Sequence, residues 1–125
     1  QDGVCVDSPT NRALLRTLKD IPFGMVRKRE DDGGVPVWKW LRRNKLEGSK
    51  LLLCGVNGSC CVYHTYRSLQ DRQIKHDTGG EIAVLERATA CDQRPDHWQT
   101  YYSNGRIWTS TAKAYFQPQK TRGVR

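Results

Sequence analysis

An Asn-Gly pair set among cysteines constrains this chain more than any other feature. Asn57 and Gly58 separate two runs rich in apolar residues and cysteine, residues 51–56 and 59–63. An Asn-Gly pair between such runs is the strongest short-range signal for a β-hairpin, because both residues adopt the positive φ of a type I′ turn. The pattern predicts a tight turn between two antiparallel strands, with the cysteines placed on both sides of it.

Three further segments resemble turns, because each is rich in glycine, aspartate or asparagine: residues 31–34, 77–80 and 103–105. The gaps between the intervening runs are short, and short gaps favour antiparallel pairing, since parallel pairs need long crossovers. We therefore expect a mainly β, α+β fold. Its six- to seven-stranded antiparallel sheet forms a sandwich or a barrel and is stabilised by disulfides.

One helix is expected before the strands, at about residues 9–20. Ser8 can cap its first turn, Pro9 suits the first helical position, and Pro22 ends the run. Its leucines recur at helical spacing, which predicts a face that packs on the core. The chain is short enough for one globular domain, residues 1–116, followed by a flexible basic tail at residues 117–125.

Positive charge is concentrated in two stretches. The chain carries a net charge of +8, and residues 36–50 and 97–125 contribute +4 and +5 while the other segments nearly cancel. If the two stretches meet, they form a surface that attracts an acidic protein or an anionic glycan, and nucleic acid is a further option. The candidate binding residues are Lys39, Arg42, Arg43, Arg106 and Lys113.

Five cysteines in 125 residues indicate disulfides formed in an oxidising compartment, with one thiol left over that can link two chains. The candidates are Cys5, Cys54, Cys60, Cys61 and Cys91, whose connectivity stays open. The alternative is a zinc site made from Cys54, Cys60, Cys61 and His64. Adjacent cysteines on a strand point to opposite faces and do not converge on one ion, so we expect no metal and no cofactor.

The chain also carries signs of secretion. It starts at Gln1, as expected of a mature chain whose signal peptide has been removed. Asn57-Gly58-Ser59 is an acceptor sequence for N-glycosylation, which operates only in the secretory pathway. The sequence contains no apolar run near 18 residues, so we expect no transmembrane segment.

Two sets of side chains invite a sharper functional interpretation. His64, Glu86 and Arg106 are the residue types that a small ribonuclease uses as acid, base and phosphate ligand. The second set is aromatic and lies among basic residues: Trp38, Trp40, Trp98, Tyr101, Tyr102 and Trp108. Such rings can stack on sugars or bases, but a chain with two phenylalanines also needs them for its core, which is the interpretation we favour.

The pattern as a whole predicts a secreted, basic, disulfide-stabilised protein that acts by binding another macromolecule, as ligands, toxins, effectors and inhibitors do. We expect a binding protein rather than an enzyme. The two alternatives are a small secreted hydrolase, above all a ribonuclease, and a binder of anionic glycan or nucleic acid.

Overall fold

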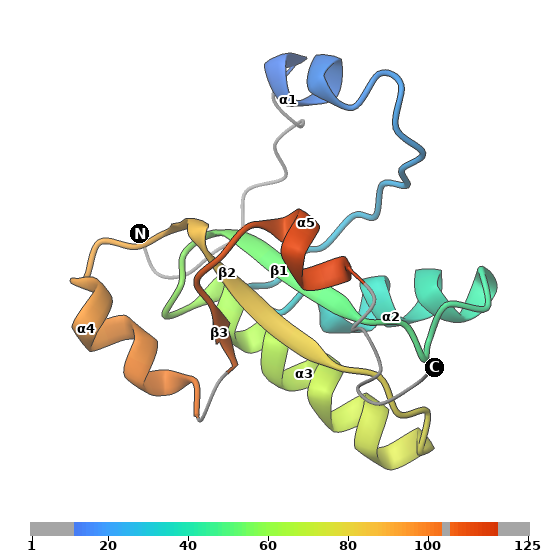
Figure 1. Cartoon of the computed structure of the whole chain (residues 1–125). Coiled ribbons are helices and arrows are strands. Elements are labelled where there is room, and N and C mark those ends of the chain that lie inside the picture. The colour runs from blue at the N-terminus through green and yellow to red at the C-terminus, as the bar shows by residue number, and fades with distance from the viewer. Residues whose placement is uncertain (1–11, 104–105, 118–125) are drawn as a thin grey trace, which may run out of the picture.

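The computed structural model describes residues 12–103 and 106–117, and Figure 1 shows their arrangement. Three strands form one parallel sheet of order β1-β2-β3. The elements, in chain order, are α1 (Arg12–Thr17), α2 (Gly34–Arg43), β1 (Leu51–Val56), α3 (Cys61–His76), β2 (Ile82–Ala90), α4 (Pro95–Trp98), the 3-10 turn η1 (Gln99–Tyr101), β3 (Ile107–Trp108) and α5 (Ala112–Phe116).

The expected antiparallel sandwich or barrel of six to seven strands is wrong. Asn57-Gly58 does not close a hairpin but connects β1 to the longest helix, α3, which returns the chain to β2 in parallel. The run after the turn is helical because its buried side chains recur every three or four residues: Val62, Tyr66, Leu69 and Gln73. That periodicity outweighs the strand preference of its valine, threonine and tyrosines.

Position 58 requires glycine for a reason other than the positive φ of a hairpin turn. Gly58 does not have a positive φ. Among the described glycines, positive φ values occur at Gly55, Gly79 and Gly80. A Cβ at Gly58 would lie 2.8 Å from the ring of Trp98, so glycine is needed for the close approach of that ring.

The pairing of β1 with β2 contains an irregularity near the end of β1. The register runs from Leu53 opposite Val84 directly to Gly55 opposite Thr89, so β2 carries extra residues between the two pairs. Gly55 has φ +133°, a conformation that L side chains rarely adopt, and this explains glycine at the bend. The hydroxyl of Thr89 donates to the carbonyl of Leu85 at 2.7 Å and closes the bulged segment on itself.

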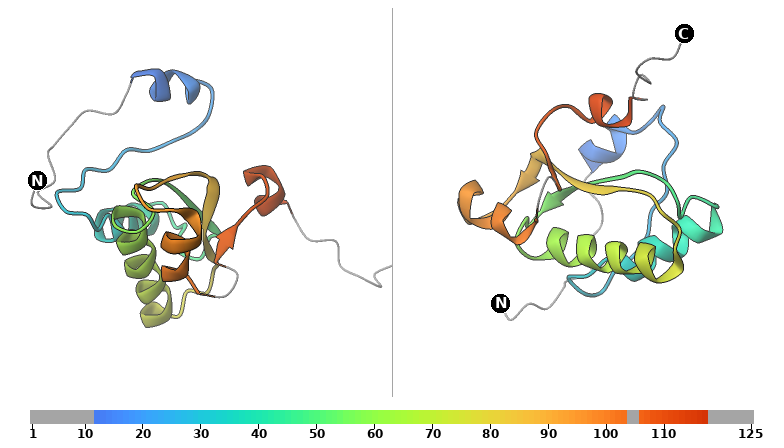
Figure 2. Two further views of the ribbon diagram at one scale, coloured as in Figure 1. Left: turned by 90° about the vertical axis from the view of Figure 1, so that its left-hand side faces the viewer. Right: turned by 60° about the horizontal axis from the view of Figure 1, so that its bottom comes forward.

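The core lies between the sheet and the helices α2 and α3. Figure 2 shows α3 along one face of the sheet, with α2 beside it and α5 on the opposite side. The buried apolar residues that form the cluster are Trp38, Leu41, Val62, Tyr66, Leu69, Ile82, Val84, Trp98 and Tyr102. The predicted use of aromatic residues in the core is thus confirmed for Trp38, Trp98 and Tyr102, whereas Tyr101 is exposed.

The described part of the N-terminal helix lies inside its predicted range. Its described part is α1, and the expected start near residue 9 lies outside the described residues. None of the α1 side chains that the structure describes is buried, and α1 stands away from the sheet in Figure 1. Residues 21–30, which connect α1 to the segment before α2, are exposed throughout.

The expected disulfides are not found among the described cysteines. Cys54, Cys60, Cys61 and Cys91 are all free, and Cys5 lies outside the described residues, as does most of the expected tail. Cys54 and Cys61 do not face each other, because Cys54 lies on β1 while Cys61 begins α3. Within the described ranges, no helix combines the length and the apolar character needed to cross a membrane.

Candidate functional site

The loop that joins β1 to α3 lies where the carboxyl ends of the parallel strands meet, the edge at which open α/β sheets bind ligands. Gly58 fixes it on both sides, since its N–H donates to Ala90 at 3.0 Å and its carbonyl accepts from the hydroxyl of Tyr102 at 2.6 Å. The carbonyl of Asn57 accepts from the N–H groups of Cys60 and Val62. The loop therefore presents Cys60 and Cys61 from a fixed backbone.

Both of these cysteines contact one carboxylate. The Sγ of Cys60 lies 3.3 Å from Oδ2 of Asp31, and the Sγ of Cys61 lies 3.5 Å from Oδ1 of Asp31. The two thiols and the carboxylate lie within 4.8 Å of one another, and all three residues are half-buried. Burial raises the pKa of Cys60 to about 11, and the nearby carboxylate of Asp31 adds to the rise.

The backbone explains how neighbouring cysteines come to point at one group. Cys60 is the N-cap of α3, with φ −132° and ψ −92°, whereas Cys61 is the first helical residue. The chain therefore bends between them, and the strand alternation that should separate their side chains does not apply.

Asp31 reaches the thiols from the segment before α2. The N–H of Gly33 donates to the hydroxyl of Thr65 on α3 at 2.8 Å, and the N–H of Gly34 donates to Asp32 at 2.7 Å. Gly34 is buried, and a Cβ there would collide with the side chain of Ser68. This close contact between the segment and α3 holds Asp31 beside the start of the helix.

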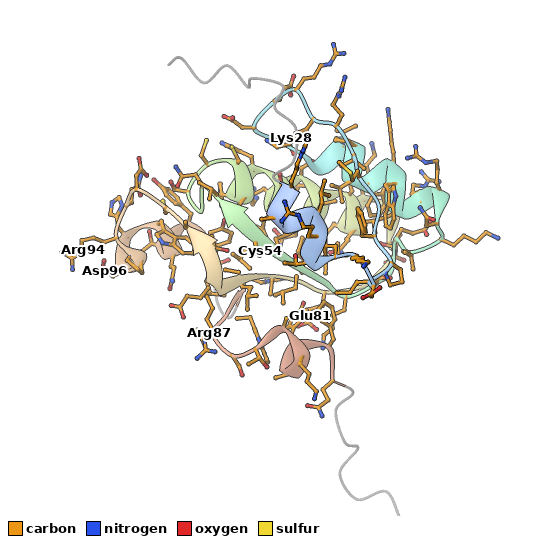
Figure 3. All side chains as sticks on the ribbon, turned by 90° about the horizontal axis from the view of Figure 1, so that it is seen from above. Lys28, Cys54, Glu81, Arg87, Arg94 and Asp96 are labelled. Atoms are coloured by element: carbon orange, nitrogen blue, oxygen red, sulfur yellow. The ribbon has the colours of Figure 1, made fainter. Side chains whose placement is uncertain are left out.

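The other two described cysteines stand apart from this cluster. Cys54 is exposed on β1 (Figure 3). Cys91 follows β2, where its Sγ lies 3.3 Å from the hydroxyl of Ser59 and accepts from the N–H of Gln93. Of the four residues in the alternative zinc site, Cys60 and Cys61 lie together in this cluster, whereas Cys54 and His64 are not part of it.

A second candidate site is formed by two adjoining surface hollows, which we call the basic surface. The first, of about 340 Å³, is lined by Asp32, His64, Arg67, Ser68, Asp71, Arg72 and Lys75. The second, of about 410 Å³, is lined by Arg27, Lys28, Arg29, Glu30, Asp32, Val35, Pro36 and Lys39. Because Asp32 lines both, the hollows form one continuous surface over α3, α2 and the segment before α2, with seven basic and three acidic side chains.

Aromatic rings border the basic surface on α3. The rings of Tyr63 and His64 have centroids 5.7 Å apart, and those of Tyr63 and Tyr101 are 5.5 Å apart. Arg67 connects the basic surface to these rings, since it lines the first hollow and its Nη1 donates to the hydroxyl of Tyr63 at 2.9 Å. Tyr101 is 46 % exposed, so a flat ligand can reach it, and Tyr63 connects it to Arg67.

The residues predicted to bind a partner are dispersed over several elements. Lys39 lines the basic surface from α2, and the exposed Arg42 and Arg43 end the same helix. Arg106 is half-buried just before β3, and Lys113 is exposed on α5. The two basic stretches do make contact, because Nζ of Lys50 donates to the carbonyl of Tyr115 at 2.7 Å.

The three residues of the ribonuclease alternative lie on different elements. His64 is on α3, Glu86 on β2 accepts from Gln99 at 3.0 Å, and Arg106 precedes β3. No contact recorded for the described residues joins any two of them. Asn57, the predicted glycosylation site, is half-buried with its side-chain oxygen inaccessible, and its modification stays a prediction.

The sequence could not indicate the role of Asp31 or of Arg67, Arg72 and Lys75. Asp31 is 29 residues from Cys60, and the three basic residues come together only once residues 61–76 are helical. Comparison with protein-family models, with curated proteins and with solved structures found no match to this chain.

Proposed function

We propose that this protein binds single-stranded nucleic acid along the basic surface. The observation that carries the proposal is a basic surface connected to an exposed aromatic ring: Arg67 of that surface contacts Tyr63, and Tyr63 in turn packs against Tyr101. Proteins that bind single strands combine a positive groove for the backbone with aromatic side chains on which bases stack. An acidic protein would interact with the basic side chains, but it has no bases to stack on the aromatic rings.

The surface chemistry supports a polyanion over a small anion. The basic side chains are spread over two hollows rather than directed at one point, which suits a row of phosphates. Arg67 already lies over the ring of Tyr63, with its Cζ 5.9 Å from the centroid. A guanidinium held against a ring is prepared to contact a phosphate at its edge while a base stacks beside it.

Fluorescence anisotropy with a labelled single-stranded oligonucleotide tests the proposal. Binding should weaken with salt, and Arg67→Ala or Arg72→Ala should each reduce the slope of log K against log salt by about 0.7, because each removes one phosphate contact. Tyr101→Ala should cost about 1–3 kcal/mol of binding free energy through lost stacking. Arg87→Ala is the matched control, since Arg87 is exposed on β2 (Figure 3) and lines neither hollow.

Binding of a duplex and of heparin distinguishes single-stranded nucleic acid from other polyanions as the ligand. A duplex of the same sequence should bind more weakly, because its bases are already stacked and cannot reach Tyr101. Retention on heparin together with no measurable affinity for the oligonucleotide would show that the partner is an anionic glycan. Equal losses in Arg67→Ala and Arg87→Ala would show that net charge alone drives binding.

A further inference from the structure

The cluster of Asp31, Cys60 and Cys61 brings three potential metal ligands together from two distant segments of the chain. Two thiols, weak donors, share a single carboxylate, and the three ligand atoms come from two segments held together independently by the contact of Gly33 with Thr65. Without an ion both thiols donate to Asp31, and a bound cation would take the place of their two protons. The arrangement gathers three ligand atoms of types that zinc accepts.

The distances fit a shared ion. A sulfur at about 2.3 Å and an oxygen at about 2.0 Å from a tetrahedral zinc ion lie about 3.5 Å from each other. The observed separations between sulfur and carboxylate oxygen are 3.3 Å for Cys60 and 3.5 Å for Cys61. Because the two thiols contact different oxygens of Asp31, the carboxylate must turn so that one oxygen lies near both sulfurs when an ion binds.

The donor set selects the class of metal. Two thiolates favour a borderline or soft ion over Mg²⁺ and Ca²⁺, which prefer oxygen ligands throughout, and one carboxylate is compatible with zinc. We propose that Asp31, Cys60 and Cys61 bind one Zn²⁺ ion, with water in the fourth position. The ion bound there joins the segment before α2 to the first turn of α3.

Metal binding by the reduced full-length chain is the direct test. Titration with Co²⁺ should produce the near-ultraviolet charge-transfer absorption of a cobalt–thiolate bond at one ion per chain, and Zn²⁺ should displace it. Cys60→Ser and Cys61→Ser should each weaken zinc binding by at least about 100-fold, because loss of even an outer-shell partner costs about 10–100-fold. Asp31→Asn should also weaken it, by at least about 10-fold.

Matched variants exclude unspecific binding through thiols. Cys54→Ser and Cys91→Ser each remove one described thiol that lies outside the cluster, and both should bind zinc with unchanged affinity. Absence of the charge-transfer band in the wild-type chain would overturn the proposal. So would a loss of binding in Cys91→Ser that equals the loss in Cys60→Ser.

A measurement on the wild-type chain keeps the test independent of whether the variants fold. Alkylation mapped by mass spectrometry should show that zinc protects Cys60 and Cys61 while the exposed Cys54 reacts at an unchanged rate. Equal alkylation of all three cysteines with and without zinc would contradict the site.

Discussion

Gly58 shows how a single residue can fix the position of a loop. Its backbone is bonded to Ala90 and to Tyr102, and the ring of Trp98 covers the space where a side chain would begin. The peptide groups on both sides of Gly58 are therefore confined between β2 and the aromatic part of the core. Any side chain at this position displaces either the ring or the loop.

Gly58→Ala is expected to lower the free energy of unfolding by about 1–3 kcal/mol, because the added methyl group overpacks the contact with Trp98. Gly79→Ala is the comparison. Gly79 has φ +69°, but no atom lies within 4 Å of the position that a Cβ would take, so its cost of about 1 kcal/mol comes from the backbone alone. Urea denaturation measures the free energy of unfolding of both variants. A smaller loss for Gly58→Ala than for Gly79→Ala would contradict the packing argument.

At the scale of elements, α3 is the main support of the fold, because it contacts α2, β1 and β2. One side of the helix is buried and another carries the charged residues of the basic surface. The helix thus supplies both the core and the candidate binding site. Substitutions on its two sides should have separable effects on stability and on binding.

Leu69→Ala should destabilise the protein by about 2–5 kcal/mol, because the Leu69 side chain is 0 % exposed and its truncation leaves a cavity in the core. Ile74→Ala, on the same helix, should change stability by less than about 0.5 kcal/mol, since Ile74 is 73 % exposed. Thermal denaturation followed by circular dichroism distinguishes them. Equal shifts in melting temperature would mean that the two sides of α3 are assigned incorrectly.

The sequence allowed some elements to be predicted and misled about others. The aromatic core and the basic character depend on composition, and composition is independent of topology. The hairpin prediction failed because the apolar spacing of Val62, Tyr66 and Leu69 competes with the Asn-Gly signal, and only packing on the sheet decides between them. Once residues 61–76 are helical, the strands on either side of α3 become parallel, and Cys54 and Cys61 no longer lie opposite each other across a hairpin.

At the scale of the whole molecule, the candidate sites depend on contacts between distant segments. Asp31 meets Cys60 and Cys61, and Asp32 joins the two hollows, only because the segment before α2 lies along α3. No local pattern in the sequence specifies that contact. The grouping of the site residues was therefore beyond prediction from spacing, although the sequence does mark the cysteines as unusual.

Limited digestion with trypsin should cut within residues 27–29 before it cuts in α3, because residues 21–30 are exposed and lie outside helices and strands. Arg67 and Arg72 should be cut much later, since a protease needs local unfolding to reach a residue inside a packed helix. A time course read by mass spectrometry gives the order. Cleavage in α3 as early as at residues 27–29 would contradict the arrangement.

The short third strand has a consequence for solubility. Within the described residues, β3 pairs only with Val84 and Leu85, so the later part of the nine-residue β2 has no strand on that side. An uncovered edge is where a second chain adds by strand pairing and starts aggregation. Glu86 and Arg87 lie on this part of β2, and a strand arriving there must desolvate their charges. We therefore expect these two charges to disfavour strand addition at this edge.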